Sequence, residues 1–120
     1  MIQLTKHFTE EEVNCNCGCR YVPPAHSLLR LEELREAWGK PIKLTSAARC
    51  RTHNAKVGGV PDSKHVLGEA YDILLPNNQR WPFIQLAMQL GWGGIGVANS
   101  FIHIDLRPVS ESRIWIYSNK

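Results

Sequence analysis

The chain is organised around the stretch S-K-H-V-L-G-E-A-Y-D at residues 63–72. Gly68 divides this stretch, and residues 69–74 then alternate in the way that is typical of a strand entering a core. The pattern places His65 on a loop and Asp72 on a strand. An imidazole and a carboxylate on two adjoining segments can converge on one ion, so this stretch predicts part of a metal site.

A second alternating stretch, F-I-H-I-D-L at residues 101–106, supplies two more polar side chains. On a strand, His103 and Asp105 point to the same face. His65, Asp72 and His103 together make the three-ligand set of a catalytic zinc site, with the fourth position left for water. An aspartate inside an apolar strand is costly unless it is paired or binds a cation, and this applies to both Asp72 and Asp105. The alternative is a buried ion pair with one of the arginines.

The bulk composition predicts one domain, spanning residues 1–120, with a core of its own, because 43% of the residues are hydrophobic. The net charge of +3 comes from scattered basic residues, which disfavours nucleic acid as a partner. We expect a monomer. No apolar run approaches the roughly 18 residues of a membrane span. The N-terminus lacks the profile of a secretory signal, so we expect synthesis in the cytoplasm and action on another compartment only after release or within a virion.

Four cysteines fall at Cys15, Cys17, Cys19 and Cys50. The C-x-C-x-C spacing of the first three differs from the C-x-x-C knuckle that suits tetrahedral zinc. Reduced thiols, a disulfide from Cys50 to the N-terminal cluster, and a structural zinc site all remain open.

The order of the expected elements predicts an α+β fold, with a small, mostly antiparallel sheet and helices packed on one side. Thr9 caps a short first helix, and Ser27 caps an amphipathic helix that ends at Gly39. Pro82 is expected in the first turn of the last helix. The other expected elements are a strand at 41–46, a helical turn and tight loop at 51–62, a strand at 69–74, a turn at 76–78, a helix at 80–90, a glycine-rich strand near 91–96, and strands at 101–106 and 113–117.

Asp105 and Arg49 are the candidates for catalytic and substrate-binding roles. Asp105 either takes a proton from zinc-bound water as a general base or accepts the second ring N–H of a ligand histidine. Arg49 can offer a bidentate fork to a substrate carboxylate. The remaining histidines lie in polar or loop contexts and are expected to be solvated: His7, His26 and His53.

Several motifs together resemble the zinc D-Ala-D-Ala carboxypeptidase family of peptidoglycan peptidases. They are S-A-A-R at 46–49, H-N at 53–54 with V-G-G at 57–59, S-x-H-x-x-G-x-A-x-D at 63–72, and F-I-H-I-D at 101–105. The resemblance covers about residues 40–107, and the opening F-T-E-E-E-V-x-C is also similar. The small members encoded by bacteriophages and prophages are similar in length.

The resemblance implies a zinc held by His65, Asp72 and His103, on the small α+β fold shared with the signalling domain of hedgehog proteins. It implies hydrolysis of a peptide bond involving D-amino acids in peptidoglycan stem peptides or cross-links, by a carboxypeptidase or an endopeptidase. Arg49 matches an arginine that helps to orient substrate, and Ser63 matches the serine before the first ligand.

One departure from the family pattern concerns the general base. Several relatives carry a Glu or Asp a few residues before the final histidine, whereas residues 97–100 here are V-A-N-S, so Asp105 takes that role by default. A catalytically silent wall-binding or virion structural module that keeps the metal is therefore a second hypothesis. A nucleic-acid-binding zinc module built on the cysteines is a third, disfavoured because the basic residues are not interleaved with exposed aromatics.

Overall fold

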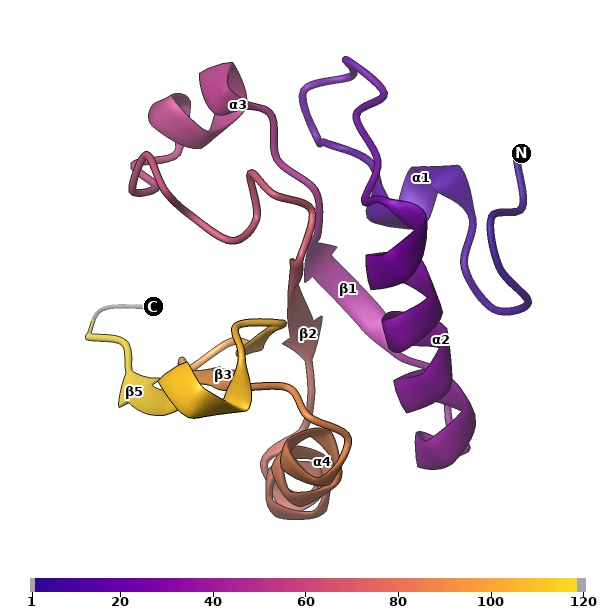
Figure 1. Ribbon diagram of the computed structural model, residues 1–120, viewed down its shortest axis with the longest axis vertical. Helices are drawn as coiled ribbons and strands as arrows, with labels where there is room; N and C mark the ends of the chain where they lie inside the picture. The colour runs from indigo at the N-terminus through magenta and orange to yellow at the C-terminus, as the bar shows by residue number, and fades with distance from the viewer. Residues whose placement is uncertain (1, 119–120) are drawn as a thin grey trace.

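The computed structural model describes residues 2–118, in which five helical segments accompany a five-stranded sheet (Figure 1). In chain order these elements are α1 (Glu10–Val13), α2 (Ala25–Trp38), β1 (Lys43–Ser46), α3 (Arg51–Lys56), β2 (Ala70–Leu74), α4 (Asn77–Gln89), β3 (Gly94–Val97), β4 (Ile102–Asp105), the 3-10 helix η1 (Val109–Glu111) and β5 (Arg113–Ile116). The predicted domain also includes residues 1, 119 and 120, which lie outside the described residues.

The sheet has the strand order β1-β2-β4-β3-β5. The pairs β1–β2, β2–β4 and β3–β4 are antiparallel, whereas β5 runs parallel to β3. The predicted α+β class with a mostly antiparallel sheet is therefore confirmed. The parallel β5 places the C-terminal part of the described chain beside the glycine-rich β3.

The two faces of the sheet have different roles because side chains alternate along each strand. Tyr71 and Ile73 of β2 belong to the hydrophobic core, together with Leu31 of α2 and Phe83 of α4. Asp72 lies between them in sequence and points to the opposite face. The helices α2 and α4 thus cover the apolar face, and the polar face stays available for a site.

The start of α2 differs from the prediction that Ser27 is its N-cap. The helix begins at Ala25, after Pro24 in an extended conformation. Ser27 is buried inside the first turn and its hydroxyl lies 2.7 Å from the hydroxyl of Tyr71. The predicted end is confirmed, since Gly39 caps the helix at φ 73° and its N–H donates to the carbonyl of Arg35.

The helix α4 begins earlier than expected, so the predicted turn at 76–78 is wrong for residues 77 and 78. Arg80 explains the longer helix, because its guanidinium donates to the carbonyl oxygens of Ala98 at 2.6 Å and Asn99 at 3.0 Å. These bonds fasten the first turn to the loop after β3. Pro82 consequently falls beyond the first turn, where we expected it.

Two histidines that we expected to be solvated have acidic partners. Nδ1 of His7 lies 2.5 Å from Oε2 of Glu32, and the His7 side chain is 25% exposed. Nε2 of His26 lies 2.8 Å from Oε2 of Glu69, although the His26 side chain remains 62% exposed. Local sequence did not reveal these partners because each lies more than twenty positions away. Within residues 2–118, no helix combines the length and apolarity needed to cross a membrane.

Candidate metal centre

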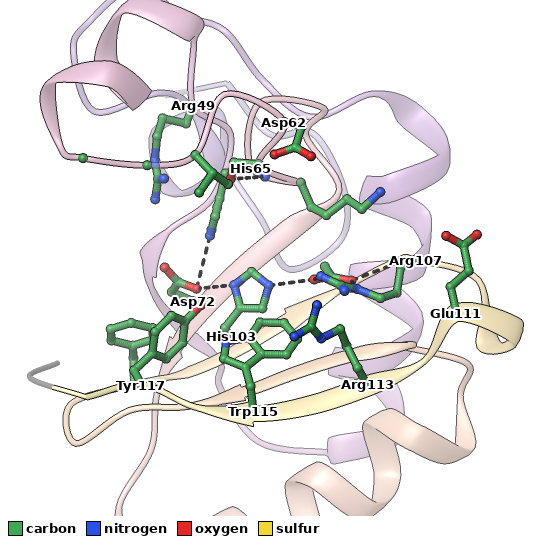
Figure 2. Close-up of a pocket in the computed structure, with 17 residues that line it drawn as sticks. Arg49, Asp62, His65, Asp72, His103, Arg107, Glu111, Arg113, Trp115 and Tyr117 are labelled. Atoms are coloured by element: carbon green, nitrogen blue, oxygen red, sulfur yellow. Dashed lines mark hydrogen bonds and ion pairs between the residues drawn. The ribbon is translucent and has the colours of Figure 1, made fainter.

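The side chains of His65, Asp72 and His103 converge at one point on the polar face of the sheet (Figure 2). Oδ1 of Asp72 lies 3.2 Å from Nε2 of His65 and 3.0 Å from Nδ1 of His103. All three residues are buried, and one ligand atom from each lies within 4.8 Å of the others. The structure thus brings together the three residues that the sequence predicts as metal ligands.

Strand pairing explains two of the three positions. Asp72 on β2 is the direct antiparallel partner of His103 on β4, and paired residues present their side chains on the same face. His65 comes from the loop between α3 and β2. Gly68 turns that loop with φ 70°, and its N–H donates to the carbonyl of His65. A side chain at Gly68 would be strained there, which explains the glycine that divides the motif.

Each histidine ring has an inner nitrogen, which faces Asp72, and an outer nitrogen, which faces away from it. Each outer nitrogen has its own hydrogen-bond acceptor. Nδ1 of His65 donates to the carbonyl of Ala47 at 2.7 Å, and Nε2 of His103 donates to Oδ2 of Asp105 at 2.8 Å. In the neutral rings these bonds leave the lone pairs on the inner nitrogens, which is the form that binds a metal, whereas protonated rings donate from the inner nitrogens to Asp72. Such outer acceptors are the usual means of orienting metal-binding histidines.

The donor set fits a zinc ion. With zinc–nitrogen and zinc–oxygen bonds near 2.0–2.1 Å, the ligand atoms of a tetrahedral site are about 3.3 Å apart. The two inner nitrogens lie 3.2 Å and 3.0 Å from the Asp72 oxygen, close to that edge length. His65, Asp72 and His103 are therefore the residues that would hold zinc.

Electrostatics favour a charged Asp72. Burial alone raises the pKa of its carboxyl group, but hydrogen bonds from His103 and His65 outweigh burial and hold the pKa well below its usual range. For His103, burial lowers the pKa, whereas the hydrogen bonds to Asp105 and Asp72 raise it above the ordinary value. The carboxylate is thus available as an anionic ligand.

Asp105 is fully buried and bonded on both of its oxygens. Oδ1 accepts from Nε and from the backbone N–H of Arg107, while Oδ2 accepts from Nη2 of Arg107 and from His103. Burial raises the pKa of Asp105, but these partners lower it well below its usual range. Of the two roles left open by the sequence, this environment favours holding His103 in place. The sequence also left open a buried ion pair between an aspartate and an arginine. Asp105 forms such a pair with Arg107, whereas Asp72 faces the two histidines.

Two glycines of β3 make room on the site face. Gly94 pairs with Asp105, and a Cβ at Gly94 would lie 2.2 Å from Oδ1 of that aspartate. Gly96 pairs with Trp115 of β5, and a Cβ there would lie 2.8 Å from the indole. The missing side chains of this strand therefore leave space for side chains of the site itself.

Arg49 and Ser63, the predicted substrate-binding residues, both line the pocket. The guanidinium of Arg49 donates to Oδ1 of Asn54 at 3.0 Å and to Oγ of Ser46 at 3.2 Å. Asn54 is itself buried, and its amide donates to the carbonyl of Val60 at 2.7 Å. Oγ of Ser63 accepts from the backbone N–H of His65 at 3.2 Å. Ser63 therefore also supports the loop that carries His65.

The pocket has a volume of about 620 Å³, and side chains of both charge signs line it: the basic Arg49, Lys64, Arg107 and Arg113, and the acidic Asp62, Asp72, Asp105 and Glu111. Figure 2 shows Arg49 on one side of the ligand cluster, and Arg107 and Arg113 on the other. Sequence reasoning did not assign a role to several residues that line this pocket: Asp62, Arg107, Glu111, Arg113, Trp115 and Tyr117. The alternation of residues 113–117 was the available signal, since it placed Trp115 and Tyr117 on one face.

Trp115 forms an aromatic wall beside the ligands. Its ring centroid lies 5.2 Å from that of His103, and the guanidinium carbon of Arg107 lies 4.9 Å from the same indole. Cation–π contact of this kind holds Arg107 beside Asp105. The C-terminal strand thus takes part in the site although it contributes no ligand.

A buried His-Asp-His set in an open pocket on an α+β fold is the arrangement expected of a metal-dependent hydrolase. Comparison with protein families supports a narrower statement, because the family model for Peptidase M15 matches residues 6–105. The chain belongs to the Peptidase M15 family, a zinc D-Ala-D-Ala carboxypeptidase-like family of metallopeptidases. No individual curated protein is similar enough to count as a match.

The matched range includes every residue of the candidate metal set together with Asp105. It ends before β5, so the aromatic wall at Trp115 and the arginine at Arg113 lie outside it. Peptidases of this family are generally zinc-dependent and act on peptides.

Proposed function

We propose that this protein is a zinc-dependent peptidase that hydrolyses D-amino-acid-containing bonds in peptidoglycan stem peptides or cross-links. The observation that carries the proposal is the convergence of His65, Asp72 and His103 in an arginine-lined pocket of a Peptidase M15 chain. Peptidoglycan stem peptides carry free carboxylates, and the arginines around this pocket suit such a substrate.

Each residue of the site has a part in this proposal. When bound, zinc polarises the scissile carbonyl and lowers the pKa of a water molecule toward about 7. Asp105 holds the ring of His103, and the carbonyl of Ala47 holds that of His65, so both inner nitrogens keep their direction. Arg49, braced by Asn54 and Ser46, binds a carboxylate of the substrate and positions the peptide.

The metal assignment is tested by metal analysis of the purified protein. The wild type should hold zinc at this site, and His65→Ala should lose that zinc while keeping its fold by circular dichroism. An unchanged metal content in His65→Ala would contradict the site assignment.

The reaction is tested by mass spectrometry of muropeptides after digestion of purified sacculi. Zinc-loaded protein should release peptide fragments, and their masses name the bond that is cut and distinguish a carboxypeptidase from an endopeptidase. His65→Ala at the same concentration is the matched control and should release none.

A second candidate function is a catalytically silent wall-binding or virion structural module that retains the metal. The full engagement of both Asp105 oxygens favours it, because a carboxylate held by Arg107 and His103 is a poor proton acceptor. This candidate predicts that zinc-loaded protein binds sacculi of several wall chemistries and leaves them intact, under conditions in which an active relative digests them.

A further inference from the structure

The four cysteines gather at a second place in the fold, which the proposed peptidase chemistry does not use. One Sγ atom from each of Cys15, Cys17, Cys19 and Cys50 lies within 4.8 Å of the others. The Sγ atom of Cys17 is 3.4 Å from that of Cys15 and 3.6 Å from that of Cys50. Cys50 is thirty-three positions away from Cys17, so folding itself brings the thiols together.

The sulfur–sulfur distances match a tetrahedral metal site and not a disulfide. Zinc–sulfur bonds of 2.3 Å give sulfur atoms about 3.8 Å apart at the corners of a tetrahedron. A disulfide requires a separation near 2.05 Å. The distances of 3.4 Å and 3.6 Å lie close to the tetrahedral edge, and all four cysteines are free thiols.

The backbone around the thiols is shaped to present them. Gly18, with φ 85°, and Arg20, with φ 68°, both adopt the left-handed conformation, which is uncommon for a residue such as arginine. The N–H of Cys15 donates to the carbonyl of Tyr21 at 2.8 Å and closes the loop. This tight loop allows cysteines at alternate positions to face one centre, although their spacing is not that of a zinc knuckle.

Two backbone N–H groups also point at sulfur atoms. The N–H of Cys50 donates to Sγ of Cys15 at 3.3 Å, and the N–H of His53 donates to Sγ of Cys50 at 3.4 Å. Hydrogen bonds to sulfur stabilise thiolates, which are the form that binds metal.

We propose that Cys15, Cys17, Cys19 and Cys50 form a structural zinc site, separate from the His65-Asp72-His103 centre. Four thiolates in tetrahedral arrangement suit zinc, and zinc binding releases the protons of the thiols to solvent. The site closes the loop of residues 15–19 onto the start of α3. The inference does not depend on peptidase activity.

The proposed site supports the active-site loop. Cys50 directly follows Arg49, whose backbone N–H donates to the carbonyl of His65 at 3.0 Å. Ala47 accepts the bond from His65, and the N–H of Ala48 donates to the carbonyl of Val13 at 3.2 Å. Residues 47–50 thus connect the thiols to a metal ligand and to the substrate-side arginine, so loss of the structural zinc should disturb both.

The test is zinc analysis of three versions of the full chain purified under reducing conditions. The wild type should contain about two zinc ions per chain, as expected for one structural and one catalytic site. Cys17→Ser/Cys19→Ser should lose one ion, and His65→Ala/His103→Ala should lose the other. X-ray absorption of the histidine variant should show a pure sulfur shell near 2.3 Å, the zinc–thiolate bond length.

Three results would overturn the proposal. The first is an equal zinc content in the wild type and the double cysteine variant. The second is a disulfide in the intact mass of the reduced preparation. The third is an absence of zinc–sulfur scattering in the zinc-loaded wild type, a measurement that does not depend on whether a variant folds. Failure of the peptidase proposal is distinguishable, because it is read from the absence of fragment release from sacculi, whereas the cysteine variant would still lose one zinc ion relative to the wild type.

Discussion

Asp105 accepts a hydrogen bond from His103 at 2.8 Å while its own carboxylate is completely shielded from solvent. Arg107 closes the other side of the carboxylate with its backbone N–H and two guanidinium nitrogens. The result is a chain from Arg107 through Asp105 and His103 to Asp72, in which each group orients the next. Such a chain holds a metal ligand more firmly than an isolated histidine would.

Replacing Asp105 with Asn tests this relationship. Because Asn binds the ring N–H of His103 less strongly, we expect the zinc affinity to fall by about 10–100-fold. Activity should recover in part when zinc is supplied in excess. Zinc affinity is measured by competition with a chelator, and turnover by fragment release from peptidoglycan.

Asp62→Asn is the control for Asp105→Asn, since Asp62 lines the same pocket but is exposed. It should leave zinc affinity unchanged. If Asp105→Asn abolishes turnover while zinc stays bound, Asp105 is the general base and the supporting role is wrong.

Replacing Gly94 with Ala tests whether the polar face depends on a missing side chain. The added Cβ would lie 2.2–2.4 Å from three atoms of the Asp105 carboxyl group. We expect destabilisation of about 1–3 kcal/mol, as for other overpacked sites, together with weaker zinc binding. The free energy of unfolding in urea measures the first effect.

A double-mutant cycle identifies the cause of that loss. In the Asp105→Ala background, Gly94→Ala should lower the free energy of unfolding by less than it does in the wild type. The coupling free energy between the two substitutions should be about 0.5–3 kcal/mol. Gly96→Ala is the control, because its neighbours are Trp115 and Tyr117 and not Asp105. Additive effects of Gly94→Ala and Asp105→Ala would show that the clash is not the cause.

Arg49→Lys should weaken substrate binding without loss of zinc. Lysine keeps the charge but cannot bind Asn54, Ser46 and a carboxylate with one planar group. Losing a charge-assisted hydrogen bond costs about 1.5–3 kcal/mol, which corresponds to a rise in KM of roughly ten- to a hundredfold. Steady-state kinetics on a defined muropeptide measures this change. Arg51→Lys, at an exposed neighbour, should leave KM unchanged; an equal effect at both positions would rule out a specific role for Arg49.

Glu32→Gln should loosen the N-terminal segment from α2. The Glu32 carboxylate accepts from the hydroxyl of Thr5 at 2.7 Å and from the backbone N–H of His7 at 2.8 Å. Replacement should cost about 1–2 kcal/mol near neutral pH, the scale of lost hydrogen bonds to a charged group. Chemical denaturation of the two proteins measures the difference.

The contribution of Glu32 to the free energy of unfolding should also depend on pH. Burial raises the pKa of this carboxyl group, but hydrogen bonds from His7 and Thr5 outweigh burial and lower it below the ordinary value of 4.5. A lowered pKa in the folded state means that the unfolded state binds more protons, so this stability is present above about pH 4.5 and is lost as the pH falls. The gap between wild type and Glu32→Gln should therefore shrink in acid. Glu33→Gln, at an exposed site beside Arg30, should show no such gap.

Much of the fold and the ligand set could be predicted from local patterns. Alternation placed Asp72 and His103 on strands, and helical spacing located α2 and its end at Gly39. These features depend on the backbone repeat, which is a property of neighbouring residues. The start of α4 was missed because Arg80 binds a loop that is nearly twenty positions away.

The sequence by itself thus determined which residues are the candidate metal ligands: Asp72 and His103, which the strand repeat aims away from the core, and His65 on the loop before β2. Only the tertiary structure decided their partners. It placed the carbonyl of Ala47 against His65, gathered Cys50 with the N-terminal cysteines, and brought Trp115 beside His103 through the parallel pairing of β5 with β3. The reason is that side-chain direction follows from local geometry, whereas the partner that a buried polar group receives depends on contacts between segments far apart in the chain.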